Sequence, residues 1–228
     1  MENLIAYTDL LLDGTIVTVS VGVASLVLSV VLGLLGAWAK LSKSKPAQMV
    51  SGAYTTLIRG VPDLVLMLLI FYGGQILINN MTEAAGWGYV EIDAFTAGVS
   101  TIGFIFGAYM TETFRGAILA IPRGEIEAGI SCGMSRPLVF RRVIWPHLVR
   151  LALPSFGNNW LVLIKATALC SVIGLDDVVR QADIAGKSVR EPFTFMAAVM
   201  VVFLIITSVS IQAMRWAEKR YSAGVRRG

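Results

Sequence analysis

The sequence has little charge, and long stretches of it have none. Only 15% of its 228 residues are Asp, Glu, Lys or Arg, while 56% are hydrophobic. Soluble domains carry about 25% charged residues, so this composition excludes an ordinary soluble protein. Four long stretches contain no charged residue, and a fifth contains only Lys165. These stretches are 14–39, 64–82, 94–111, 192–214 and, with the lysine, 151–175.

Each stretch is long enough to cross a bilayer. An α-helix rises about 1.5 Å per residue, so about 20 apolar residues span the roughly 30 Å of hydrocarbon. Lys165 does not exclude the fifth stretch, because a bundle can satisfy a single interior lysine. The sequence therefore predicts an all-α membrane protein with five transmembrane helices. We expect a single transmembrane domain over residues 1–228, with its core from about 12 to 215.

Charges of the two signs are distributed unevenly among the loops. Residues 1–13 and the loop 79–93 contain acids but no lysine or arginine, whereas the loop 176–191 is mixed. Lysine and arginine concentrate on the cytoplasmic side of membrane proteins, which predicts a periplasmic N-terminus and a cytoplasmic C-terminus. The net charge of +4 is then explained by the cations of the cytoplasmic segments. We therefore expect no nucleic-acid partner. The cytoplasmic cations would be Lys40, Lys43, Lys45, Arg59, six arginines between 115 and 150, and Arg215, Lys219, Arg220, Arg226 and Arg227.

Residues suited to catalysis or metal binding are scarce. The chain has one histidine, His147, and two cysteines that lie far apart. Gly186-Lys187-Ser188 resembles the end of a phosphate-binding loop, but the glycine that this motif needs at position 181 is Gln181. No metal-ligand spacing and no nucleophile with its base is evident. We therefore expect a non-catalytic chain with no cofactor or metal of its own.

The predicted cytoplasmic loop, about 120–150, is longer than a minimal connection between spans. It begins with good helix formers, and Gly133 then permits a tight turn. Ser135 can cap a second short helix, which we expect Pro146 to end. These features alone fit either a surface hairpin that connects two spans or an element that docks a partner.

The spacing within this loop resembles the signature of permease subunits of bacterial ATP-binding-cassette importers. That signature is Glu-Ala-Ala, three residues, Gly, nine residues, then Ile-x-Leu-Pro. This chain has glycine at the third alanine, valine at the isoleucine and Trp145 at the leucine. The resemblance implies a coupling helix that docks into a groove of the ATPase subunit. The matching positions are Glu127, Ala128, Gly129, Gly133, Val143 and Pro146.

The resemblance extends over nearly the whole chain. It is strongest to permeases for polar amino acids, above all those for histidine, lysine, arginine and ornithine, with octopine and nopaline permeases nearby. It rests on "YTTLIRGVPDLVLMLLIFYG", "GAYMTETFRGAI", "LPSFGNNW" and "AGKS..EPF", at 54–73, 107–118, 153–160 and 185–193.

This family implies a type I fold with five helices in the bacterial inner membrane. It also implies that the chain is the Q-type permease subunit of an importer that uses ATP to move basic amino acids. This subunit would be surrounded by lipid. The implied partners are a second homologous permease in a heterodimer, two ATP-binding subunits that bind ATP and Mg, and a periplasmic amino-acid-binding protein. Another polar amino acid or an opine is an alternative substrate. An ion-coupled secondary transporter is disfavoured because no inverted repeat is visible.

Polar residues inside the predicted spans are candidates for the substrate pathway. Glu112 can receive a cationic group, or instead pair with Arg115 three residues on. Asn158 and Asn159 follow a glycine that can loosen the helix, and offer donors and acceptors to a zwitterion, or else serve interhelical packing. Lys165 can meet a carboxylate of the substrate or an acid of the partner chain.

The second predicted span is interrupted near its cytoplasmic end by the stretch 59–63. Arg59, Gly60 and Pro62 are predicted to break or kink the helix, because proline removes a backbone hydrogen bond and disfavours helix at the residue before it. Such a kink suits either gating or a purely structural turn.

Overall fold

A computed structural model describes residues 2–222, with side chains from 4 to 221. Arg226 and Arg227, two of the cations behind the predicted orientation, lie outside the described residues, as do the ends of the predicted domain, residue 1 and residues 223–228. All regular structure in the described part is helical. In chain order it comprises α1 (Glu2–Ala6), α2 (Thr8–Leu41), α3 (Lys45–Gly60), α4 (Asp63–Ala84), α5 (Ala94–Leu119), α6 (Arg123–Ser131), α7 (Arg136–Val139), the π-helix η1 (Phe140–Ile144), α8 (Trp145–Ala166), the 3-10 helix η2 (Thr167–Ile173), α9 (Val178–Ser188) and α10 (Pro192–Ser222).

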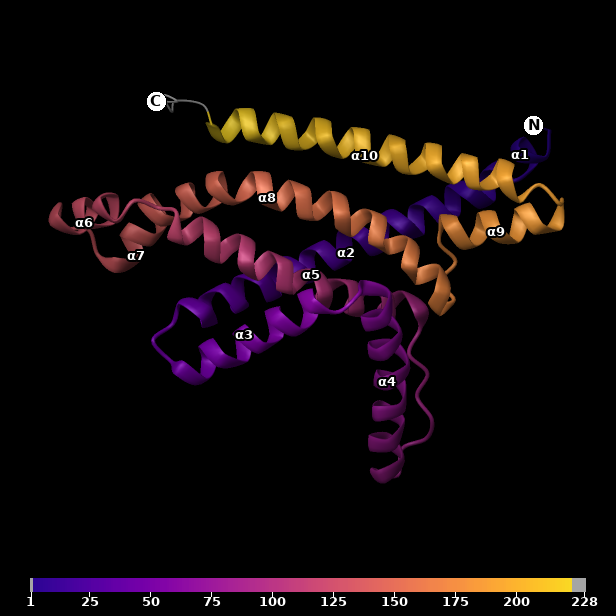
Figure 1. Cartoon of the computed structure of the whole chain (residues 1–228), viewed down its shortest axis with the longest axis horizontal. Coiled ribbons are helices and arrows are strands. Elements are labelled where there is room, and N and C mark those ends of the chain that lie inside the picture. The colour runs from indigo at the N-terminus through magenta and orange to yellow at the C-terminus, as the bar shows by residue number, and fades with distance from the viewer. Residues whose placement is uncertain (1, 223–228) are drawn as a thin grey trace.

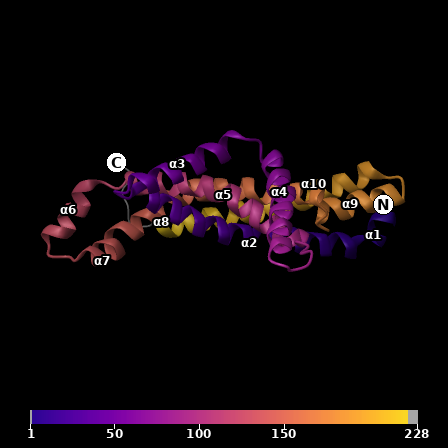
Figure 2. The same cartoon turned by 90° about the horizontal axis from the view of Figure 1, so that it is seen from below.

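The five predicted spans are confirmed. Five segments within the described residues are long and apolar enough to cross a membrane, and each contains or overlaps one predicted stretch. Four of them, α2, α5, α8 and α10, run side by side along the length of the molecule (Figures 1 and 2). The fifth, α4, stands across this direction and lies mainly against α5 (Figure 1).

The core of the bundle is the close packing of α2 against α5. A Cβ atom on Gly33 would lie only 2.4 Å from Cβ of Met110, and one on Gly103 would lie 2.6 Å from Cδ2 of Leu28. Both distances are far below van der Waals contact, so only glycine allows the two backbones to approach this closely. The apolar window of α5 is consequently 61% buried, the largest share among the five spans.

Three helices, α1, α3 and α9, were not predicted. No helix was expected between the first two spans, and 176–191 was expected to be a loop. Pro46 in the first turn of α3 and Asp177 at the N-cap of α9 are start signals that could have identified α3 and α9. The stretch that resembles a phosphate loop lies in α9, where a Cβ on Gly186 would come within 3.0 Å of Cα of Pro192.

The break predicted at 59–63 is present. α3 ends at Gly60, Val61 is extended with φ −114° and ψ 140°, and Pro62 is the N-cap of α4. The extended residue before proline follows from the steric clash that proline imposes on its predecessor. Because α3 and α4 point in different directions (Figure 1), the chain turns completely here instead of kinking.

The prediction that Pro146 ends a short loop helix is wrong. α7, η1 and α8 follow one another without interruption. Pro146 follows the π-helical turn of η1 directly, and this wider turn accommodates the residue that cannot donate a backbone hydrogen bond. The side chain of Ser135, at the N-cap position of α7, makes no capping hydrogen bond.

The N-terminus of α9 docks against α2. A Cβ on Gly14 would lie 2.8 Å from Cα of Val178, whose N–H donates to Oγ1 of Thr18 over 3.2 Å. Beside it, the fully buried Asp177 accepts the N–H of Arg180 at Oδ1, while its Oδ2 has no hydrogen-bond partner among the described residues. Burial raises the pKa of Asp177 to about 6.

This raised pKa predicts a pH-dependent stability. The ordinary pKa is 3.8, so the folded state holds the proton more tightly than the unfolded chain. Stability from this group is full below about pH 4 and falls, by about 2 to 3 kcal/mol in total, as the pH rises through about 6. We expect Asp177→Asn, which keeps an N-cap, to raise the melting temperature at about pH 7.5 and to flatten its decline from about pH 4.5 upward.

The matched control is Asp176→Asn, at the exposed neighbour that pairs with Arg180 over 3.0 Å. The charge of Asp176 makes the smallest contribution to the pKa of Asp177, so this variant should change the slope of melting temperature against pH far less than Asp177→Asn does. An unaltered slope in Asp177→Asn would show that this carboxyl is already ionised at low pH in the folded protein.

Candidate functional site

A polar hollow of about 540 Å³ lies where α3, α5 and α8 meet. Its residues on α5 follow the spacing i, i+3, i+4 and so share one face of that helix. The hollow therefore brings together side chains that are distant in the sequence. Its lining residues are Arg59, Tyr109, Glu112, Thr113, Pro154, Ser155, Asn158 and Asn159.

Both carboxylate oxygens of Glu112 are engaged. Oε1 accepts a hydrogen bond from Nζ of Lys40, and Oε2 accepts one from Nε of Arg115 over 3.0 Å. Lys40 also donates to Oγ1 of Thr55 over 2.6 Å, so the cluster joins α2, α3 and α5. The expected ion pair of Glu112 with Arg115 is present, and Lys40 is a second cation that binds the same carboxylate. The charge of Glu112 is thus balanced from within the chain.

Arg59 supplies the one cation among the lining residues of the hollow. Its guanidinium carbon lies 5.5 Å from the centre of the Tyr109 ring, a cation–π contact that holds the exposed arginine at the rim. Together with Glu112, the lining presents one positive and one negative group. Gly60 and Pro62 do not line the hollow and instead shape the turn that follows Arg59.

The two asparagines of α8 have different surroundings. Asn159 donates from Nδ2 to Oγ1 of Thr113 over 2.9 Å, an interhelical contact, whereas Asn158 is exposed in the hollow. The predicted loosening at Gly157 is wrong, because α8 runs through it unbroken. Gly157 instead lets α10 approach, since a Cβ there would lie 3.3 Å from Cγ of Met214.

Lys165 lies apart from this group. It is exposed and stands seven residues beyond Asn158, on the same face of α8, without lining the hollow. Sequence reasoning missed Tyr109, Thr113 and Ser155. The spacing of the sequence could have identified them. Tyr109 and Thr113 flank Glu112 at helical spacing, and Ser155 precedes Asn158 by three residues.

The segment with the importer signature projects beyond one end of the bundle, as α6 and α7 (Figures 1 and 2). Glu127 and Ala128 are exposed on α6, and Gly133 has a φ of +79°, which forms the turn between the two helices. The predicted helix, glycine turn and second helix are confirmed. Val143 is half-buried in η1.

Gly129 is the buried residue of α6. A Cβ there would lie 3.5 Å from Cγ2 of Val139 and 3.6 Å from Cγ2 of Val143, which is ordinary van der Waals contact. Glycine in place of the alanine of the signature is therefore a mild departure, because the packing already has room for a methyl group.

His147 joins this segment to the fourth span. Its Nε2 lies 2.9 Å from Oε2 of Glu125 on α6, and its Nδ1 lies 2.9 Å from the carbonyl oxygen of Val143. The contact ties the first turn of α8 to the first turn of α6.

The family model for the inner membrane component of binding-protein-dependent transport systems matches residues 15–223. The chain belongs to this family. It is 51% identical to the histidine/lysine/arginine/ornithine transport system permease protein HisQ of Escherichia coli (strain K12), over 98% of both chains. It is 43% identical to the octopine transport system permease protein OccQ of Rhizobium meliloti, over 96% of this chain and 92% of the other.

Solved structures agree with the permease family. A crystal structure of an amino acid ABC transporter with histidines superposes with a TM-score of 0.77 at 34% identity, covering 95% of this chain and 96% of the other. The MetNI methionine ABC transporter, in an inward-facing conformation, superposes with a TM-score of 0.74 at 17% identity and supports the fold alone. The predicted type I permease fold and inner-membrane location are confirmed.

The charge cluster of the permease gives a stability prediction. Glu112→Gln leaves Lys40 half-buried without its counter-ion, and we expect a loss of about 2 kcal/mol. The same change in a fully buried pair would cost more stability, but the side chains of Lys40 and Glu112 are 17% and 20% exposed. The double variant Lys40→Met/Glu112→Gln should recover at least half of the loss in thermal unfolding of the purified protein.

The control is Lys187→Gln, which breaks an exposed i, i+4 pair with Asp183 and should change stability by less than about 0.5 kcal/mol. Losses that simply add in the double variant would show that Lys40 and Glu112 are not coupled.

The two glycines of the segment with the importer signature, Gly129 and Gly133, should respond in opposite ways to alanine. Gly129→Ala fits its surroundings and should be neutral or stabilise by up to about 1 kcal/mol. Gly133→Ala places a Cβ in the left-handed region and should destabilise by about 1 to 2 kcal/mol. Melting temperatures and co-purification of an ATP-binding partner measure both effects. Equal behaviour of the two variants would contradict the turn at Gly133.

Proposed function

We propose that this permease subunit forms part of the membrane pathway of an ATP-driven importer for basic amino acids, namely lysine, arginine, ornithine and histidine. The observation that carries the proposal is the 51% identity, over 98% of both chains, to HisQ, whose name specifies these four substrates.

The chemistry of the polar hollow supports an amino-acid substrate. Arg59 can hold the α-carboxylate, while the Asn158 amide oxygen can accept from the α-ammonium group. A lining with one cation, one anion and two amides suits a zwitterion. Glu112 is already paired with two cations, so the preference for a basic side chain rests on the relatives and on a separate binding protein.

The remaining subunits of the proposed importer follow from the family. A second homologous permease forms a heterodimer with this chain, and the apolar windows of α4 and α10, each only 11% buried, leave wide faces for it and for lipid. Two ATP-binding subunits hold ATP and Mg and contact Glu127, Ala128 and the rest of α6. A periplasmic binding protein delivers substrate to the opposite end, so the N-terminus is periplasmic and the C-terminus cytoplasmic.

Lys165 and the turn at Gly60 and Pro62 keep proposed roles in this assembly. Lys165 is exposed on the same face of α8 as Asn158, where it can meet an acid of the second permease or a substrate carboxylate on its way to the hollow. The turn at Gly60 and Pro62 follows Arg59 directly, so a change in this turn can move Arg59 toward the hollow or away from it.

An opine importer is the second candidate, because the octopine permease OccQ is 43% identical over 96% of this chain. Octopine and arginine share a guanidinium group, so competition between the two ligands separates the candidates.

Reconstitution of the complete transporter with its binding protein tests the proposal. We expect ATP-dependent uptake of labelled arginine and lysine that octopine does not displace. Arg59→Gln should reduce uptake by about tenfold or more, because the loss of a charged partner is worth more than one kcal/mol. Lys43→Gln, at an exposed lysine outside the hollow, is the control. Uptake driven by an ion gradient without ATP would refute the proposal.

A further inference from the structure

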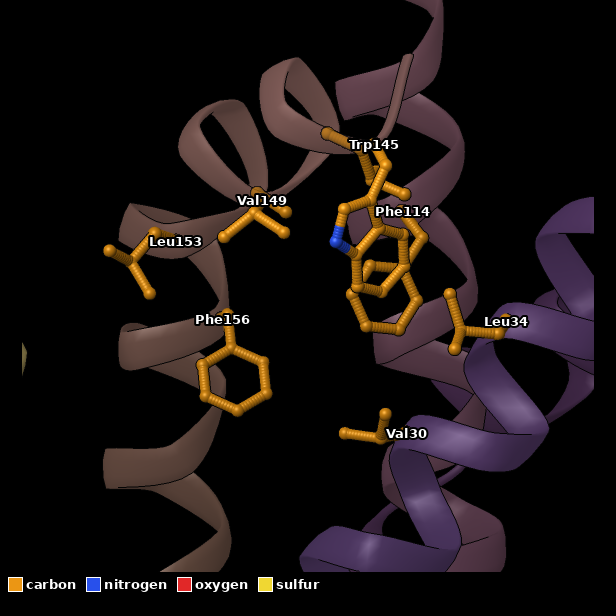
Figure 3. A pocket seen from close by; sticks show the side chains of 9 residues that line it. Val30, Leu34, Phe114, Trp145, Val149, Leu153 and Phe156 are labelled. Atoms are coloured by element: carbon orange, nitrogen blue, oxygen red, sulfur yellow. The ribbon is translucent and has the colours of Figure 1, made fainter. Parts of the chain in front are cut away.

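A second cavity, of about 210 Å³, lies between α2, α5 and α8, and every residue that lines it is hydrophobic. In Figure 3, Val30 and Leu34 of α2 lie across it from Phe156 of α8, and Phe114 stands between them. Trp145, the residue that departs from the leucine of the importer signature, closes one end of the cavity (Figure 3).

A basic hollow of about 350 Å³ adjoins this cavity at the same end of the bundle. Arg150, Arg215 and Lys219 line it together with one acid, Glu218, and Leu153 lines both the hollow and the apolar cavity. Among the described residues, none of the three cations has an ion-pair or hydrogen-bond partner. With three cations and one acid in its lining, the hollow therefore has a net positive charge next to an apolar space.

The apolar cavity shares no lining residue with the polar hollow, and the basic hollow shares only Pro154 with it. Seven residues separate Val149 from Phe156, a rise of about 10 Å, which is within the depth of one leaflet.

We propose that one anionic phospholipid binds here, with its headgroup in the basic hollow and one acyl chain in the apolar cavity. Basic pockets between transmembrane helices at the cytoplasmic side suit anionic headgroups, and tryptophan is favoured at the membrane interface. Leu153 forms a wall of both spaces, so they lie close enough for a single molecule to reach both. The site does not depend on which amino acid the importer carries.

Quenching of tryptophan fluorescence by brominated lipids tests this site in the assembled transporter. The probes are phosphatidylglycerol and phosphatidylcholine with bromine on their acyl chains, at equal mole fractions. We expect stronger quenching by phosphatidylglycerol. The excess should disappear in Trp145→Phe and persist in Trp87→Phe, a matched change at an exposed tryptophan outside the cavity.

The charges are tested by Arg150→Gln/Lys219→Gln, with Arg220→Gln as a control at an exposed cation that does not line the hollow. The double variant should reduce the preference for phosphatidylglycerol by about fivefold or more, since a cation at an anionic membrane surface contributes about that factor. The control should retain the preference.

Three outcomes would overturn the proposal. Equal quenching of Trp145 by both lipids would show that the headgroup charge is not recognised, and an unchanged preference in the double variant would exclude the basic hollow. Quenching by neither lipid would show that a protein subunit covers the cavity. The comparison of the two lipids needs no substitution, so it remains decisive even if the double variant fails to fold.

Discussion

The close contact between α2 and α5 is the constraint on which the rest of the permease depends. Glycines bring the two backbones together, and α3 then lies along this pair, where the Ser51 hydroxyl donates to the carbonyl of Gly36 over 2.9 Å. Tyr54 donates to the carbonyl of Phe104 over 2.5 Å. In a membrane these bonds replace water as partners of polar groups. With α2 and α3 occupying two sides of α5, the face that carries Glu112 is left to form the polar hollow.

α8 connects the segment with the importer signature to this hollow. It continues α7 and η1 without a break, and His147 fastens its first turn to Glu125 of α6. A displacement of α6 can therefore reach Asn158 through one continuous helix. Pro154 lies between the two ends and lacks the N–H that would bond to Arg150, so a bend of α8 is most easily accommodated there. Residues of α8 line both the polar hollow and the apolar cavity, so both would change with such a bend.

The features predicted correctly from the sequence are those that local patterns determine. Hydrophobic length identifies spans, proline restricts the residue before it, and helical spacing brings Glu112 to Arg115. The errors arose where a local signal has a tertiary alternative. Gly157 loosens a helix in isolation, but here it permits contact with Met214. Pro146 ends a helix in most settings, but here the π-helical turn before it lets the helix continue. α3 and α9 were missed because they are too polar to resemble spans.

The sequence by itself therefore determined the number of spans, the position of the segment with the importer signature, and the family. Membrane thickness and helical spacing act over a few residues, so these properties can be read along the chain. Only the tertiary structure decided which polar groups meet. Lys40 and Glu112 are separated by 72 positions, and no periodicity links them. They pair because glycines bring α2 and α5 close enough for a half-buried carboxylate and a lysine to satisfy one another.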